Sequence, residues 1–148
     1  MPTTRYKFLR EGLESSSGEQ IWEMSKWYKE EKLDMCNSGF HCSKKIGQAF
    51  SYVQGEILAK VEVKGENIKQ EDKECWSEMR IVNAWKWQKK DSVALSIYAA
   101  ELCLKNFEKS YPNDKRPREA IEAAKKWLIK PTSENVLAAW SAAESARS

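Results

Sequence analysis

Hydrophobic and polar residues alternate along three stretches in the first half of the chain, with the period of two typical of a half-buried β-strand. The alternation is clearest in residues 56–66, where one face carries Ile57, Ala59, Val61 and Val63. In residues 5–13, Tyr6 and Phe8 alternate with charged residues. In residues 78–88, one face carries Met79, Ile81, Asn83, Trp85 and Trp87. The pattern predicts a small, mostly antiparallel sheet.

Residues 44–55 depart from this alternation. Their apolar side chains recur at helical intervals, and the run stops at Gly55; they are Ile46, Ala49, Phe50 and Val53. This spacing predicts a short helix between two strands.

From residue 91 onward the period changes to 3.6, which indicates helices. The first helix is expected to begin at Asp91 or Ser92 and to end at the Tyr111-Pro112-Asn113-Asp114 sequence. The second opens near Pro117 and stops at Pro131, and the third begins near Ser133. The side chains expected to be buried are Val93, Ile97, Ala100, Cys103, Leu104, Phe107, Ile121, Ala124, Trp127, Leu128, Val136, Leu137, Trp140 and Ala143.

The two periods together predict an α+β protein. Residues 1–90 are expected to form the small sheet with its short helix, and residues 91–148 a helical domain. Three alanine-rich helices bury little apolar area by themselves, so we expect this C-terminal three-helix segment to pack on the sheet.

Composition narrows the class of protein. A chain of 148 residues with 41% hydrophobic residues and seven tryptophans can fold around a core. It has neither an apolar run of about 20 residues nor a signal-peptide core, so we expect a cytoplasmic protein without membrane contact. The net charge of +3 comes from 25 basic and 22 acidic residues spread along the chain, which does not indicate nucleic-acid binding.

The most reactive side chains gather in the stretch "CNSGFHCSKKIGQAFSYV", Cys36 to Val53. Cys36, His41, Cys42 and Cys75 could supply metal ligands, but structural zinc sites pair ligands two to four residues apart, so no metal is predicted. A Cys–His nucleophile would need an oriented base, and His41 is the chain's one histidine. We favour a structural hydrogen bond from His41 to a neighbouring strand or to Tyr52, and free thiols throughout.

Residues 6–88 resemble an uncharacterised domain family common in bacteriophage and prophage proteins. The resemblance rests on Tyr6-Lys7, Trp22, Tyr28, Cys36-Asn37-Ser38-Gly39-Phe40-His41, Tyr52, Val61-Glu62, Gly65 and Lys73. It implies a phage or mobile-element setting, and therefore the cytoplasm of a host cell.

Residues 92–146 resemble a family of immunity proteins. The match is Tyr111-Pro112-Asn113-Asp114-Lys115-Arg116-Pro117-Arg118-Glu119-Ala120-Ile121-Glu122-Ala123-Ala124. It implies a protein that binds and neutralises another protein, without a cofactor.

An alternative resemblance is to ADP-ribosyltransferases, which bind NAD with a first-strand Arg or His, a Ser- or Tyr-bearing strand and a late glutamate. The corresponding residues are Arg10, His41, Ser43, Tyr52 and Glu78, or Glu74 in place of Glu78. The usual pair of glutamates one residue apart is missing, which weakens this alternative.

Two segments are candidates for protein binding. Trp22, Trp27 and Tyr28 lie in a charged segment, residues 22–32, and aromatic side chains are enriched at interfaces. The alternative is a loop that caps the sheet. Arg116 and Arg118 flank a helix N-terminus, where they could bind an anion or an acidic partner, or form a structural ion-pair network.

The hypothesis favoured by the sequence is a phage- or mobile-element-encoded, non-catalytic protein that binds and inhibits another protein. The target would be a host defence factor, as for an anti-CRISPR protein, or a toxin. The alternatives are the NAD-binding enzyme and an accessory structural module of a phage particle.

Overall fold

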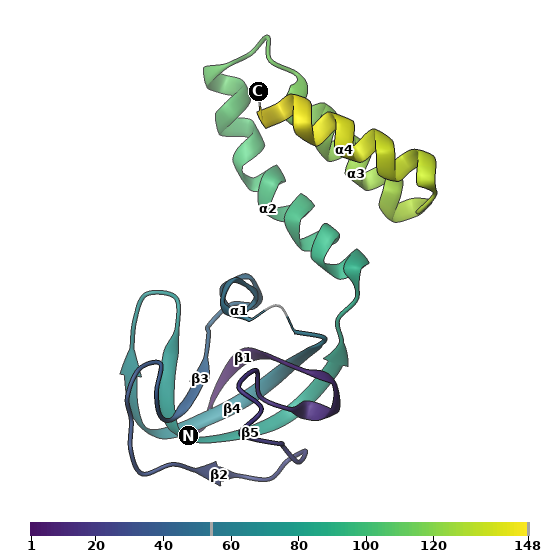
Figure 1. The fold of residues 1–148 in the computed structure, drawn as a ribbon. Coiled ribbons are helices and arrows are strands. Elements are labelled where there is room, and N and C mark those ends of the chain that lie inside the picture. The colour runs from purple at the N-terminus through teal and green to yellow at the C-terminus, as the bar shows by residue number, and fades with distance from the viewer. Residues whose placement is uncertain (54, 148) are drawn as a thin grey trace. The chain divides into compact units, whose positions relative to one another are not determined.

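The computed structural model describes residues 1–53 and 55–147, and the chain divides into two compact units, Met1–Trp87 and Gln88–Ser148 (Figure 1). The first contains the antiparallel sheet and a short helix, and the second contains three helices. The α+β class is confirmed. The division between the units falls at Trp87, slightly before the predicted boundary at residue 90.

The sheet of the first unit is built on two long strands, β4 (Ile57–Lys69) and β5 (Glu74–Lys86), which form an antiparallel hairpin. Strand β1 (Thr3–Leu9) pairs with the other edge of β4, while β2 (Tyr28–Lys29) and β3 (Phe40–Cys42) pair with different parts of β5. Every pairing between these strands is antiparallel, as predicted.

The sheet curls so that β3 returns to β1. Just after β3, Ser43 exchanges two backbone hydrogen bonds with Tyr6, each 2.9 Å long. Backbone pairing therefore runs in a circuit from β1 through β4, β5 and β3 back to β1. This curl gives the sheet an inner and an outer face.

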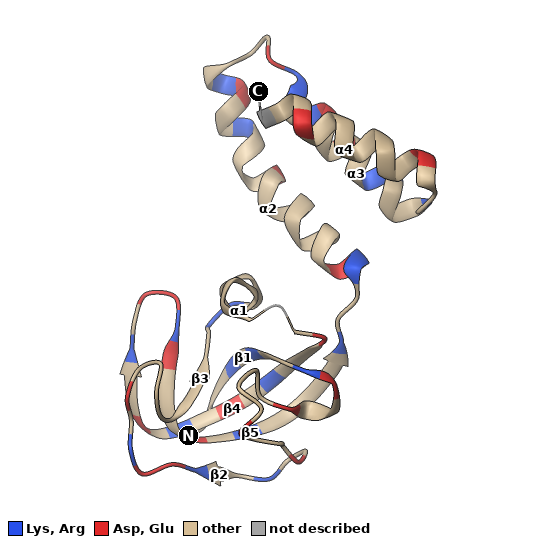
Figure 2. Cartoon of the chain, viewed as in Figure 1, with Lys and Arg blue, Asp and Glu red and all other residues tan. Residues whose placement is uncertain are grey.

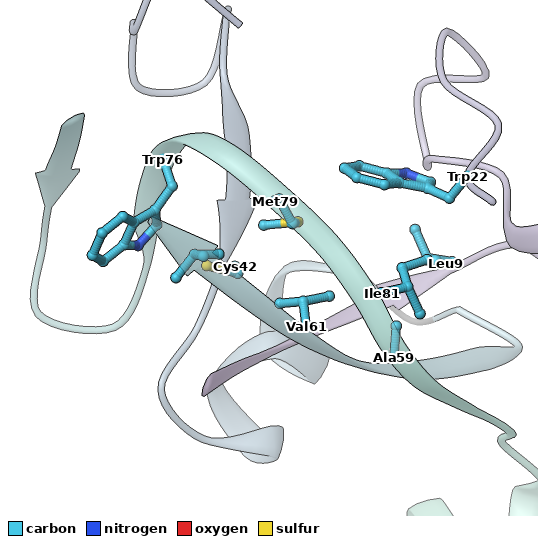
Figure 3. Packing of buried hydrophobic residues seen from close by; sticks show 9 residues of the cluster. Leu9, Trp22, Cys42, Ala59, Val61, Trp76, Met79 and Ile81 are labelled. Carbon is cyan, nitrogen blue, oxygen red and sulfur yellow. The ribbon is translucent and has the colours of Figure 1, made fainter. Parts of the chain in front are cut away.

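The inner face carries the main core cluster, in which Ala59, Val61 and Val63 of β4 have no exposed area (Figure 3). The predicted alternation of β4 is thus confirmed. The remaining buried members come from four other segments: Leu9, Trp22, Cys42, Trp76, Met79 and Ile81.

The outer face carries a second cluster beneath α1 (Ile46–Tyr52). Phe8 packs edge-on against Phe50 of this helix and against Trp87, with ring centroids 5.3 and 5.1 Å apart. Strand β1 is therefore covered on both faces, whereas its alternation predicted a half-buried strand. The charged side chains of β1 share the inner face with Leu9.

The predicted face of β5 is correct only as far as Ile81. Lys60 pairs with Asn83 but the next residue, Val61, pairs with Ile81, so Val82 is an extra residue in the ladder. Such a β-bulge reverses the facing of the residues that follow. As a result Ala84, rather than Asn83 or Trp85, packs against the inner cluster, and Trp87 joins the outer one.

Helix α1 lies where the sequence predicts it, and Val53 follows as its C-cap residue. Gln54 is outside the described residues. Gly55 does not cap the helix; a Cβ atom there would collide with the backbone of Leu9. This close approach of two backbones requires glycine.

The second unit contains α2 (Lys89–Ser110), α3 (Arg116–Ile129) and α4 (Ser133–Arg147). Its buried cluster consists of Ile97, Leu104 and Ile121. Asp91 lies inside the first turn of α2 and accepts a hydrogen bond from the backbone N–H of Gln88 at 2.7 Å, so the helix starts earlier than predicted. Ala100 and Cys103 are exposed, contrary to the prediction.

Helix α4 presents a different face to its neighbours than the sequence predicts. Leu137 and Trp140 are 64% and 68% exposed. The less exposed side is lined instead by Val136, Ala139, Ala142 and other small residues. Small side chains allow two helices to approach closely, so α4 packs through its alanines and leaves its large apolar residues exposed.

Candidate functional site

The Cys36–His41 stretch forms a tight turn whose histidine binds the turn's own backbone. His41 Nε2 accepts a hydrogen bond from the Cys36 backbone N–H at 2.9 Å. Burial, helped by the charges of Lys7 and Lys73, lowers the pKa of His41 below its ordinary range. The ring is therefore neutral at pH 7, and its basic nitrogen is occupied, which leaves no free general base here.

Gly39 allows this turn to fold. Its φ angle is +97°, and a Cβ atom there would lie 2.7 Å from Cδ2 of Leu33 and would also overlap the sulfur of Cys75. The structural role predicted for His41 is therefore present, although its partner is the turn backbone rather than another strand or Tyr52.

The four cysteines are unpaired, as predicted. The Cys75 thiol donates to the Ser38 carbonyl at 3.1 Å, and the exposed Cys36 thiol lies 2.9 Å from the ammonium of Lys73. Burial raises the pKa of Cys42 to about 12, so this thiol is not a nucleophile. Within the described ranges no three His, Cys, Asp or Glu side chains are grouped as metal ligands.

Next to this turn the first unit contains a pocket of about 500 Å³. Its walls are β1, the loop from Ser15 to Trp22, the Cys36–His41 turn, β3 and the end of α1. The lining side chains include Lys7, Trp22, Phe40, His41, Tyr52 and Lys73.

Lys7 enters the pocket from the inner face of β1. Its ammonium lies 5.3 Å from the ring centroid of Trp22, and no carboxylate of the described residues lies within 4.0 Å of it. Burial lowers the pKa of Lys7, because the surrounding protein solvates a charge less well than water does.

Lys73 supplies a second ammonium to the pocket wall. It lies 5.0 Å above the ring of Tyr52, and its contact with Cys36 raises its pKa. Both lysines line the pocket, and the charges of both help to lower the pKa of His41.

A buried ion pair fixes the strands beside the pocket. The carboxylate of Glu74, 1% exposed, accepts hydrogen bonds from Arg5 at 2.7 and 3.1 Å and from Trp76 Nε1 at 2.8 Å. Burial alone would raise the pKa of Glu74, but the hydrogen bonds from Arg5 and Trp76 hold it below its ordinary value.

The residues of the ADP-ribosyltransferase alternative are only partly brought together. His41, Ser43 and Tyr52 line the pocket, whereas Arg10 and Glu78 do not. Glu78 pairs with Lys64 at 3.2 Å, and Glu74 is held by Arg5. The arrangement that this enzyme class would need is therefore not assembled.

The aromatic residues of the 22–32 segment mostly cap the sheet. Trp22 is 3% exposed and belongs to the inner core, and Tyr28 packs on it with ring centroids 4.9 Å apart. Trp27 is partly buried, with Lys64 4.4 Å and Arg80 5.0 Å from its ring centroid. Of the predicted contact residues in this segment, only Trp27 and Tyr28 keep some exposed surface.

The two candidate arginines tie the ends of helices together. Arg116 binds Asp114 through two nitrogens at 2.9 and 2.7 Å and also reaches the carbonyl of Ser145 in α4 at 3.2 Å. Arg118 binds Glu108 of α2 at 2.6 and 2.7 Å. These contacts favour the ion-pair network over an anion site.

Sequence reasoning missed Lys7 as a pocket residue and the exposed face of α4. One signal for Lys7 was present: Phe8 and Leu9 are adjacent apolar residues, so β1 had to bury both faces, and Lys7 shares the face of Leu9. The distribution of charged residues does not mark a binding surface, because basic and acidic side chains are interspersed over both units (Figure 2).

Comparison with known proteins defines the class to which the sheet unit belongs. Residues 3–91 match the model of the family described as "Domain of unknown function (DUF7666)", which spans more than half of the chain. The chain therefore belongs to the DUF7666 family. No curated protein and no solved structure is significantly similar to it. Among the described helices, none is both long and apolar enough to cross a membrane.

Proposed function

We propose that the chain is a phage- or mobile-element-encoded, non-catalytic protein that binds and inhibits another protein in the cytoplasm of the host cell. The target is a host defence factor, such as a CRISPR effector, or a toxin. One observation carries the binding proposal: the outward face of α4 formed by Leu137 and Trp140, called here the α4 face.

The α4 face has the chemistry of a protein contact. Leu137 and Trp140 are three residues apart, so they lie on the same side of the helix, and both are more than 60% exposed. Tryptophan is among the residues that contribute most to binding energy at protein interfaces. Large apolar residues left exposed together at the surface mark interaction sites in soluble proteins.

Other helices of the same unit also expose large apolar side chains. On α2, Tyr98 and Leu102 are 61% and 64% exposed and lie one helical turn apart, and Ile129 at the end of α3 is 87% exposed. The same unit carries the resemblance to immunity proteins, whose members act by binding.

The non-catalytic part of the proposal is supported by the state of the reactive groups. The basic nitrogen of His41 is occupied by the Cys36 backbone, and burial raises the pKa of the Cys42 thiol. Arg10 and Glu78 lie away from the pocket that His41 lines.

The test mixes the purified chain with a panel of CRISPR effectors and bacterial toxins, and measures co-elution and the activity of each candidate. We expect one candidate to co-elute and lose activity. Leu137→Glu and Trp140→Glu should abolish both effects. The matched control Ala138→Glu adds the same charge at an exposed position on the flank of this face, and it should preserve them.

Two results would contradict the proposal. One is a panel in which nothing co-elutes or loses activity. The other is a target that is bound and inhibited equally well by Trp140→Glu and by the Ala138→Glu control.

A further inference from the structure

The pocket of the sheet unit is lined by two lysines, Lys7 and Lys73, which take no part in the proposed protein contact through α4. We propose that it binds a small phosphate monoester carrying an aromatic ring, with the phosphate against the ammonium of Lys7. The proposal is independent of the α4 face, because every residue of the pocket belongs to the unit Met1–Trp87.

Among the described residues, no carboxylate lies within ion-pair distance of the Lys7 ammonium. The neighbouring basic residue on the same face of β1, Arg5, is paired with the buried carboxylate of Glu74 at 2.7 Å. The groups that act on the Lys7 ammonium are the ring of Trp22, the thiols of Cys42 and Cys75, and the neutral ring of His41. Lys7 is partly buried, and a charge that is only partly hydrated and has no ionic partner destabilises the fold, a cost that a bound anion would relieve.

A second ammonium group, that of Lys73, also lines the pocket. Lys73 faces the same pocket, and its ammonium contacts the Cys36 thiol and the Tyr52 ring. Two ammonium groups suit a doubly charged phosphate better than a single carboxylate. His41 lies under the influence of both lysines but is held neutral, so it adds no charge of its own.

Glu19 and Glu30 also line the pocket and Asp72 acts on Lys73, but among the described residues none of these acids forms an ion pair with Lys7 or Lys73. Glu30 accepts hydrogen bonds from the backbone N–H groups of Glu31 and Lys32 at 3.0 and 3.3 Å, so its carboxylate is used within its own turn. Glu19 is exposed in the loop that rims the pocket.

The size and the lining of the pocket also fit a ring-bearing ligand. A volume of about 500 Å³ fits a small organic ligand and is far larger than an inorganic ion needs. Trp22, Phe40 and Tyr52 supply aromatic surface, and Ser16 and Ser17 supply hydroxyl groups at the rim. A ring-bearing phosphate monoester uses all of these groups.

The test is isothermal titration of the full chain with three probes: adenosine 5′-monophosphate, adenosine and inorganic phosphate. We expect adenosine 5′-monophosphate to bind most tightly, because only it provides both the ring and the dianion. Lys7→Met should weaken its binding about ten- to a hundredfold, as expected for loss of a charge-assisted contact. Lys7→Arg should retain most of the affinity, and Lys29→Met, an exposed lysine outside the pocket, should bind normally.

Several results would overturn the proposal. These are equal binding of adenosine and adenosine 5′-monophosphate, unchanged binding by Lys7→Met, or no binding of any probe at millimolar concentration. A circular dichroism melt checks that each variant is folded. Should Lys7→Met fail to fold, Lys73→Met takes its place, and unchanged affinity in that variant would equally refute the site.

Discussion

The buried ion pair between Arg5 and Glu74 gives the sharpest stability prediction. Glu74→Gln removes the negative charge and replaces one acceptor oxygen with an NH₂ group, which faces donors. Three hydrogen bonds end on this carboxylate, two from Arg5 and one from Trp76. A glutamine oxygen in the position of Oε2 can keep the bonds from Arg5 Nε and Trp76 Nε1, so the bond from Arg5 Nη2 is lost together with the negative charge.

The expected cost follows from these contacts. Hydrogen bonds to a charged group contribute about 1.5–3 kcal/mol each, and breaking a buried pair costs about 3–5 kcal/mol. Arg5 is 14% exposed, so water can hydrate it in part after its partner is removed. We therefore expect the free energy of unfolding to fall by about 3 kcal/mol, the lower limit of this range. This is a large part of the roughly 5–15 kcal/mol that stabilises a typical domain.

The assay is urea unfolding followed by tryptophan fluorescence, because five of the seven tryptophans lie in the sheet unit. With a slope of about 1.5 kcal/mol per molar urea, the midpoint should fall by about 2 M. The matched control is Glu62→Gln, which breaks the pair with Arg80, whose side chains are 28% and 33% exposed. That pair should contribute less than about 1 kcal/mol. Equal losses in the two variants would refute the reasoning.

Three further changes have expected outcomes. Lys7→Met should raise the free energy of unfolding by about 1 kcal/mol, since it removes a partly buried charge that has no carboxylate partner among the described residues, while methionine can keep the contact with the Trp22 ring; a lower melting temperature would contradict this. Gly39→Ala should destabilise the sheet unit by more than about 2 kcal/mol through its positive φ and the contact with Leu33, and an unchanged urea midpoint would count against it. Because the folded-state pKa of His41 is lowered, its contribution is complete above about pH 6.5 and is lost as the pH falls through the folded pKa. His41→Gln should flatten the stability profile between about pH 7 and 5, and an equally steep profile would refute this.

The elements of the fold could be predicted where one periodicity persists. The alternation in residues 56–66 identified β4 and its inner face, and the change of period near residue 91 identified three helices. The facing of β5 beyond Ile81 could not be predicted, because one unpaired residue, Val82, reverses it. A bulge depends on pairing with β4 and leaves no pattern in the strand itself.

The candidate site was harder to predict because it depends on contacts between distant segments. Lys7 belongs to the pocket only because the sheet curls and Trp22 covers its inner face. The α4 face differed for a related reason: the helix packs through Ala139 and Ala142, whereas hydrophobicity alone favours burial of Leu137 and Trp140. The prediction therefore placed the large apolar residues in the helix contact, whereas the small residues lie there because they allow closer packing.

The most direct test of the proposed function is hydrogen–deuterium exchange of the chain with and without the target identified by co-elution. We expect slower exchange of the α4 amides around Leu137 and Trp140 when the target is bound, and unchanged exchange in β1 and β3. Unchanged exchange throughout α4, with protection elsewhere in the chain, would contradict it.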